Sequence, residues 1–446
     1  MDPALKPEQL LELSDAVRES IKYEGRFASS KELMQDLSLF LQTTLSEEER
    51  GVPSIEYDTI KTAHLDYLLK DIVSHTAETG PQSARALEYA KTASDLLRRW
   101  QVRFGTDWFE LDKRRTLDMI RHGRLREVSF VTPTTELTPT QHTWKFTDMD
   151  PASEVEGNSQ FRVGQWWLNI ACAHRDGIVG SELEKPTKLG RYEDSALPLL
   201  TGKEEIVKDG EIVHYTRVGG MKDMQFSLMS LTGKPIRILR GFQLMSGYAP
   251  LAGVRYDGLW NLTSYRHHQD EEKGLAHLRI TLQRLAGQPP MKELKKIPRP
   301  SQVDDFRSYQ QYEIEIVKRT EGIRAAHEWG VQNEEEKRER ESWARIREFR
   351  SSIGAGPMRP LSGTTGLGIT LDPESFGKSI PRKSEMQLRL PPAIQAKANK
   401  AEQEARLKRE GIVKKTVIDT SLNQEYQSKS RDSGQFEDEA TRGRQL

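Results

Sequence analysis

Apolar side chains recur at helical spacing in the first 130 residues. Leu33, Leu37, Leu41 and Leu45 follow one another every four residues, directly after a possible capping box at residues 29–32. Residues 84–104 and 108–125 repeat an amphipathic pattern of the same period. The sequence therefore predicts a helical N-terminal region over residues 1–130, followed by a Thr- and Pro-rich linker at 131–158.

The pattern changes between residues 159 and 292, where short apolar runs alternate with Gly-rich turns. Such runs are typical of strands. The strand-like runs are 162–173, 196–200, 211–216, 235–242 and 258–265. Residues 275–285 fit a strand or a helix by spacing, and the surrounding strands favour a strand. A compact β domain is expected here.

Beyond residue 292 the chain is highly charged. Residues 293–350 have helical composition, with Glu–Arg pairs four positions apart such as Glu334 and Arg338. Residues 351–446 are poor in apolar side chains, so we expect a largely disordered tail. The glycines of residues 363–368 resemble a phosphate-binding loop only in composition, because no strand precedes them.

Composition narrows the function classes. The net charge is zero, and we expect no membrane span and no secretory signal, which predicts an intracellular protein. Cys172 is the only cysteine, so internal disulfides and zinc modules built on several thiolates are excluded. Cys172 lies in an apolar run and is expected to be buried and inert. We find no catalytic motif, and His267-His268 lacks the further ligands of a metal site. The predictions are no enzyme, no cofactor and no metal.

Several motifs follow one another in order along residues 163–290. They are Val163-Gly164-Gln165-Trp166-Trp167, Asp176-Gly177-Ile178, His214-Tyr215-Thr216 with Gly219-Gly220, Thr232-Gly233-Lys234-Pro235-Ile236-Arg237-Ile238-Leu239-Arg240-Gly241, Tyr248-Ala249-Pro250, Arg255-Tyr256-Asp257-Gly258-Leu259 and Gly287-Gln288-Pro289-Pro290. Together these motifs resemble the SRA-YDG domain, in its fungal form. The resemblance implies a PUA-like β-barrel that binds DNA containing modified cytosine by base flipping. No RING or PHD module accompanies it.

The resemblance also implies where DNA would bind. Tyr215 matches a tyrosine that stacks on the flipped base, and Thr216 matches its pocket neighbour. Lys203 stands where the family has a second stacking tyrosine, and Ile206 stands where it has an aspartate that reads the base edge. Isoleucine offers no hydrogen bond to that edge, so the pocket is expected to be degraded unless Glu204 or Glu205 replaces the aspartate.

Further DNA-binding candidates complete this set. They are Arg217, Gly219 and Gly220 beside the pocket and Leu183 as an apolar thumb. Only residues 221–231 fill the place of the family's base-pair-probing finger, which is usually longer. Six basic residues of the domain have two open interpretations, a single basic face that binds DNA or an ordinary solvated surface. They are Lys185, Lys188, Arg191, Lys203, Arg217 and Lys222.

The naming motif Arg255-Tyr256-Asp257-Gly258 is interpreted as scaffold. Tyr256 is expected to bury its ring, Asp257 to accept bonds from nearby backbone amides, and Gly258 to permit a sharp turn. The predicted fold is α+β, with a central barrel between helical flanks.

The predicted function is nuclear, noncatalytic binding of DNA or chromatin, including methylated CpG. Chromatin proteins would bind the flanks, and we predict neither a membrane partner nor a small-molecule substrate. The alternative is a protein-interaction scaffold whose barrel has lost base recognition.

Overall fold

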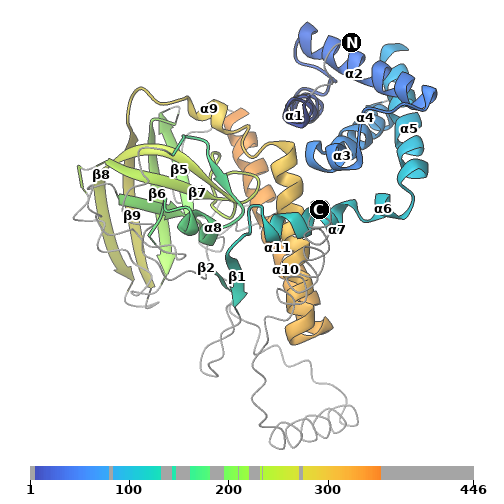
Figure 1. The fold of residues 1–446 in the computed structure, drawn as a ribbon. Helices are drawn as coiled ribbons and strands as arrows, with labels where there is room; N and C mark the ends of the chain where they lie inside the picture. The colour runs from blue at the N-terminus through green and yellow to red at the C-terminus, as the bar shows by residue number, and fades with distance from the viewer. Residues whose placement is uncertain are drawn as a thin grey trace, which may run out of the picture. The chain divides into compact units, whose positions relative to one another are not determined.

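The computed structural model describes residues 6–79, 84–131, 143–146, 161–180, 195–208, 210–219, 232–233, 235–270 and 275–352 of the 446-residue chain. These residues form N-terminal helices, a mixed sheet and C-terminal helices (Figure 1). Residues 353–446, Leu183, Gly220 and most of the predicted linker lie outside the described residues, so the predictions made for them are not tested.

The N-terminal region is helical, as predicted. Its elements are α1 (Pro7–Glu24), α2 (Lys31–Arg50), α3 (Tyr57–Ala63), α4 (Leu65–Thr79), α5 (Ala84–Phe104), α6 (Thr106–Phe109) and α7 (Leu111–Arg121). The Ser30 side chain accepts a hydrogen bond of 3.2 Å from the Leu33 amide and so caps α2. The apolar stripes of these helices meet in one core, in which Leu37 and Trp100 are completely buried.

The second region is built on strands. They are β1 (Val128–Val131), β2 (Thr143–Phe146), β3 (Trp166–Trp167), β4 (Ser195–Leu199), β5 (Lys203–Lys208), β6 (Ile212–Gly219), β7 (Pro235–Gly241), β8 (Val254–Asp270) and β9 (Leu275–Arg284). The main sheet runs β4-β7-β8-β9-β6-β5, with β3 paired to β8. Among the described strands the edges β4 and β5 do not pair with each other, so the sheet is open and the predicted PUA-like barrel is not confirmed.

Individual strand predictions have mixed outcomes. Residues 275–285 form β9, as the strand context favoured. Residues 162–173 were predicted as one strand, and this is wrong, because only Trp166–Trp167 are extended and α8 (Ile170–Arg175) follows. The Asn169 side chain accepts a 2.9 Å hydrogen bond from the Cys172 amide, which starts this helix. Residues 143–146, inside the predicted linker, pair as β2 with β1.

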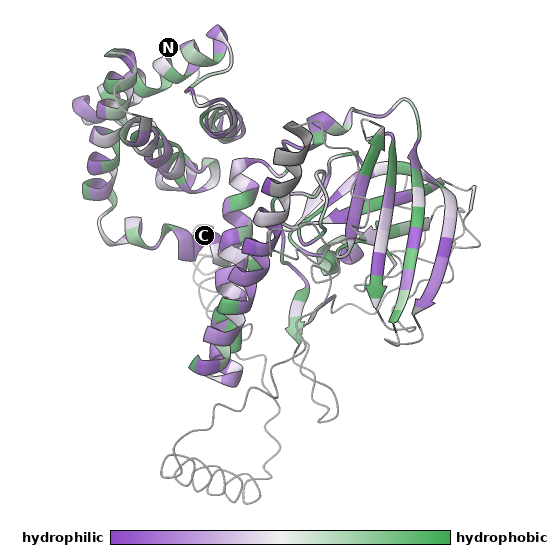
Figure 2. Cartoon of the chain, turned by 180° about the vertical axis from the view of Figure 1, so that it is seen from behind, coloured by the Kyte–Doolittle hydropathy of each residue, from purple (hydrophilic) through white to green (hydrophobic). Residues whose placement is uncertain are grey.

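Hydrophilic and hydrophobic residues follow one another along strands of the sheet (Figure 2). Successive side chains of a strand point to opposite faces. We call the face that carries Tyr215, Ile280 and Leu282 the inner face, because these side chains are buried. We call the opposite face of β8, β9, β6 and β5 the outer face. It carries Thr216 and Arg279, which are opposite each other in the register.

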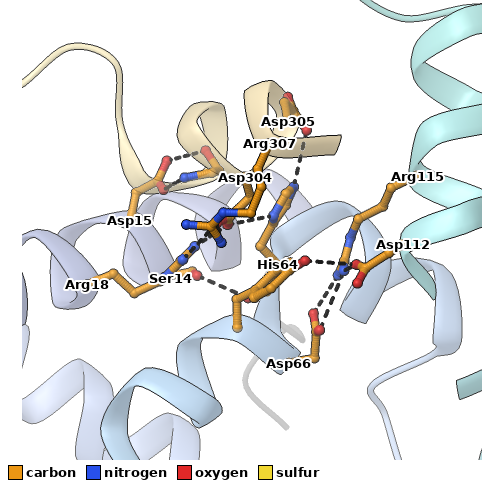
Figure 3. A network of polar contacts seen from close by, with 12 residues as sticks. Ser14, Asp15, Arg18, His64, Asp66, Asp112, Arg115, Asp304, Asp305 and Arg307 are labelled. Carbon is orange, nitrogen blue, oxygen red and sulfur yellow. Dashed lines mark hydrogen bonds and ion pairs between the residues drawn. The ribbon is translucent and has the colours of Figure 1, made fainter. Parts of the chain in front are cut away.

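Helices α9 (Met291–Leu294), α10 (Pro300–Glu321) and α11 (Ile323–Ser352) make up the predicted charged helical region. Helix α10 has polar contacts with the N-terminal helices (Figure 3). Arg18 of α1 donates to Asp304 at 2.7 Å, and Asp15 accepts a 2.7 Å bond from the Ser301 amide. Phe306 of the same helix packs in the core that contains Trp166. Across the described ranges, every helix is too short or too polar to span a bilayer.

Candidate nucleic-acid interface

The YDG motif lies inside strand β8, so the sharp turn predicted for it is wrong. Strand β7 pairs Arg237 with Leu259 and Leu239 with Tyr256, which leaves Asp257 and Gly258 opposite the single residue Ile238. Two residues opposite one define a β-bulge. The bulge rather than a turn explains the glycine, since Gly258 has a φ of +93°.

Asp257 is completely buried and pairs with two arginines. Arg240 donates to one carboxylate oxygen at 2.8 Å, and Arg255 donates to the other at 2.5 Å. The predicted partners were backbone amides, and the guanidinium groups of β7 and β8 replace them. Burial alone would raise the pKa of Asp257, but Arg255 and Arg240 outweigh this effect and hold it below its usual value.

A second carboxylate completes the cluster. Glu204 of β5 is 2% exposed and accepts bonds from Arg240 at 2.6, 3.0 and 3.1 Å. Ser246 donates a further bond to Glu204. The Arg240 guanidinium also lies 4.8 Å from the centre of the Trp260 ring. We call Glu204, Arg240, Arg255 and Asp257 the buried quartet; its formal charges sum to zero, as burial requires.

Arg255 connects the quartet to three backbone carbonyl groups in two segments of the chain. Its guanidinium donates to the carbonyl oxygens of Tyr248 at 2.5 Å, Leu294 at 2.7 Å and Ile297 at 2.8 Å. Leu294 and Ile297 lie beyond residue 292, where the β domain was predicted to end. The Tyr256 ring beside it is 4% exposed, so the prediction that it is buried is confirmed.

Gln288 of the Gly-Gln-Pro-Pro motif supports the bulge. Its side chain accepts a 2.7 Å bond from the Leu259 amide and donates to the carbonyls of Leu259 and Leu285 at 2.8 and 2.9 Å. A β carbon on Gly258 would lie 2.2 Å from its Oε1 atom. Only glycine fits this position, both for its φ and for this close approach.

The predicted base pocket is divided between the two faces. The register pairs Glu204 with Tyr215, Lys203 with Thr216, and Ile206 with Val213. Tyr215 and Ile206 therefore lie on the inner face, and Lys203 and Thr216 lie on the outer face. Partial burial lowers the pKa of Lys203. The structure brings Lys203 and Thr216 together and separates them from Tyr215.

Tyr215 does not offer a stacking surface in this structure. Its side chain is 1% exposed, and its hydroxyl donates to the Thr201 carbonyl at 3.1 Å. Its ring lies against Gly202, where an added β carbon would be 3.0 Å away. Glu204 is not free for the base edge either, because Arg240 and Ser246 occupy its oxygens.

The remaining candidates fall as follows. Arg217 and Gly219 lie on β6, and Arg217 faces the same side as its neighbour across the strands, Leu278. Lys203 and Arg217 therefore leave the sheet on opposite faces, so they do not belong to one basic face. Gly220, Leu183, Lys185, Lys188, Arg191 and Lys222 lie outside the described residues.

A hollow of about 310 Å³ lies beside α8, away from these residues. Trp166, Trp167, Arg124 and Cys172 line it. Burial raises the pKa of Cys172 to about 12, so its thiol does not ionise at neutral pH. The prediction that Cys172 is buried is confirmed, and its inertness stays a prediction. Within the described part of the chain, no cluster of three or more metal-binding side chains occurs.

Sequence reasoning missed Arg240 and Ser246 as members of the buried site. Arg240 is 17 positions from Asp257 and 36 from Glu204, so only strand pairing brings them together. The sequence contains one indication of this buried charged site. Arg255 and Asp257, two charged residues at alternate positions, lie inside an otherwise apolar run. Side chains two apart on a strand share a face, and opposite charges there predict a buried pair.

No family model matches the chain, and no curated protein matches it. Similar solved structures include Arabidopsis thaliana SUVH6 in complex with SAM, at 20% identity and a TM-score of 0.24, covering 31% of this chain and 29% of that one. The modification-dependent restriction endonuclease TagI has 18% identity and a TM-score of 0.24, covering 29% and 52%. The SUVH5 SRA domain, in a complex with fully methylated CG DNA, has 18% identity and a TM-score of 0.24, covering 30% and 97%.

The similar structures thus include SRA domains, and the chain spans under a third of the SUVH6 chain. None of these similarities is close enough to assign the family.

Proposed function

We propose that the β region is a noncatalytic DNA-binding module of the SRA-YDG type, acting in the nucleus. One observation carries this proposal. Motif segments that are far apart in the sequence meet around one buried group: Glu204 beside the pocket segment, Arg240 of β7 and Asp257 of the YDG motif. Motifs that converge on one network belong to one structural unit, which supports the resemblance from which DNA binding is inferred.

The same geometry argues for weak recognition of methylated cytosine. The stacking tyrosine is buried, the edge-reading position is Ile206, and Glu204 is engaged by Arg240. A stacked base contributes about 1–3 kcal/mol. Without that stack and without an edge hydrogen bond, affinity depends on phosphate contacts, which do not distinguish methylated from unmodified DNA. Binding is therefore strongly salt-dependent, with a methyl preference below about tenfold.

The alternative function is a protein-interaction scaffold. The division of Tyr215 and Lys203 between opposite faces favours it, because a module that flips bases needs these groups around one pocket. Chromatin proteins would then bind the helical flanks. The two functions differ in one measurable respect, namely whether the isolated chain binds duplex DNA at all.

The test titrates the full chain against matched unmodified, hemimethylated and fully methylated duplexes at several salt concentrations. The proposal expects binding that weakens steeply with salt and differs less than about tenfold among the three duplexes. A matched variant, Lys203→Tyr with Ile206→Asp, restores the family's residue types but on opposite faces of β5. We expect it to leave the preference unchanged. Absence of binding at low salt favours the scaffold, and strong methyl discrimination by the wild type contradicts the divided pocket.

A further inference from the structure

The outer face carries cations in a single row across the sheet. Arg266 of β8 is opposite Arg279 of β9, Arg279 is opposite Thr216 of β6, and Thr216 is opposite Lys203 of β5. Partners in adjacent antiparallel strands point to the same side. Because neighbouring strands are about 4.8 Å apart, the row spans on the order of 14 Å. We call Arg266, Arg279 and Lys203 the cationic row.

The positions beside this row add little negative charge. On one side the register aligns His268, His277 and Val218, and the two imidazole rings are 6.4 Å apart. On the other side it aligns Ser264, Thr281, His214 and Glu205. Glu205 is thus the one acidic side chain among these described rows. Hydroxyl and imidazole groups can also donate hydrogen bonds to an anion.

Among the described residues, no carboxylate pairs with the cationic row. Within the residues that the structure describes, Arg266, Arg279 and Lys203 form no ion pair, and both arginines are exposed. By contrast, Arg240 and Arg255 on the inner side pair with carboxylates. Like charges directly opposite each other destabilise a sheet. Such conflicts with local stability are expected at functional surfaces.

We propose that the cationic row docks the phosphate backbone of a nucleic acid. This inference rests on the proposed DNA binding and adds which face of the sheet meets the backbone. Guanidinium groups bind phosphate oxygens through two parallel hydrogen bonds, and an ammonium group supplies a point charge. A flat row of cations on strands reads no base edge, so it binds methylated and unmodified DNA alike.

The experiment compares two charge-reversal variants of the full chain. Arg266→Glu with Arg279→Glu changes the row, and Lys292→Glu with Lys296→Glu makes the same change in net charge at exposed positions outside the sheet. Affinity for an unmodified duplex is measured from about 50 to 200 mM salt. The row variant is expected to lose at least about tenfold in affinity and about two units of salt slope. The control is expected to lose less than about threefold, because distant charges are screened.

Each other outcome overturns the inference in a distinguishable way. Equal losses in both variants mean that only net charge matters. DNA binding that survives in the row variant places the docking face elsewhere and leaves the proposed function standing. A wild type that binds no duplex overturns both. Binding of poly-aspartate, rather than DNA, that depends on the row assigns the face to an acidic protein partner. If the glutamate variant does not fold, Arg266→Gln with Arg279→Gln serves as the test, with a smaller expected loss.

Discussion

The two faces of the main sheet use the same residue type in opposite ways. On the inner side Arg240 and Arg255 are completely buried, and both donate to Asp257. On the outer side Arg266 and Arg279 are exposed, and no acid pairs with either among the described residues. The difference shows that an arginine in a strand has no fixed role. Its partner and its exposure decide whether it stabilises the fold or can bind another molecule.

Energetics reinforce this contrast. A buried charge loses its hydration and must recover that free energy from paired groups, so removal of one partner leaves another charge uncompensated. An exposed charge keeps its hydration and contributes little to stability. Substitutions on the inner side should therefore change the free energy of unfolding, and substitutions on the outer side should mainly change binding.

The largest expected effect is at Asp257. Asp257→Ala removes the carboxylate shared by Arg240 and Arg255 and leaves both guanidinium groups buried without it. We expect the free energy of unfolding to fall by about 3–5 kcal/mol, measured by urea denaturation. Asp58→Ala, at a side chain that is 79% exposed, is the matched control and should change stability little. A variant that unfolds like the wild type but loses DNA affinity would make Asp257 a DNA contact.

Glu313 sharpens the comparison, because it is a buried acid that pairs with no cation among the described residues. Trp144 donates to its Oε1 atom at 2.6 Å, and Tyr309 donates to the same atom. Burial raises the pKa of Glu313 from 4.5 to about 7, although these two bonds oppose the shift. The folded state therefore binds more protons than the unfolded state between these pH values. The contribution of the protonated Glu313 to the free energy of unfolding is therefore fully present below pH 4.5 and is lost as the pH rises to about 7.

Glu313→Gln should remove this dependence, because glutamine still accepts the bonds from Trp144 and Tyr309 but does not ionise. We expect the variant to be more stable than the wild type by about 1–3 kcal/mol at pH 8, and by much less at pH 5. Urea denaturation at both pH values measures the difference. Glu315→Gln, on the same helix at a side chain that is 59% exposed, is the control. An equal effect at both pH values would contradict the role of ionisation.

The bulge at Gly258 gives a smaller effect on the inner side. Gly258→Ala requires a side chain at a φ of +93° and pushes against Gln288, whose three hydrogen bonds prevent it from moving freely. Gly233 has a φ of +80° with open space around it. Gly233→Ala therefore carries the backbone strain alone, about 1–2 kcal/mol. We expect Gly258→Ala to lose about 1–2 kcal/mol more in thermal or urea unfolding. Equal losses would mean that Gln288 yields without cost.

The local pattern predicted much of the fold. Short apolar runs at residues 235–242 and 258–265 identified β7 and part of β8, and the leucines from Leu33 onward identified α2. The strand prediction for residues 162–173 was wrong because a short apolar run fits a strand or a buried helix equally well. The Asn169 cap was the feature that distinguished them.

The candidate site was harder to predict. Aligning residues along the chain placed Lys203, Ile206 and Tyr215 in one pocket, but pairing of β5 with β6 decides their faces. One position along a strand reverses the face of a side chain, so a linear match does not establish a pocket. Likewise, the partners of Asp257 come from β7, and long-range pairing of this kind is not encoded in the YDG motif itself.

The smallest expected effect lies on the outer side and has the opposite sign. Arg266 and Arg279 are directly opposite, and this like-charge pair destabilises the sheet. Arg266→Gln should therefore raise the free energy of unfolding by about 0.2–0.5 kcal/mol at low salt. The gain should vanish near 1 M salt, where screening acts over about 3 Å. Urea denaturation at both salt concentrations measures it, with Arg98→Gln, an arginine that pairs with Asp95 on α5, as the control that should not gain stability. A loss of stability in Arg266→Gln would show that the arginine stem packs on the sheet and outweighs the repulsion. In that case the outer arginines would contribute to the fold, as the inner ones do, and the contrast between the two faces would be weaker than their pairing indicates.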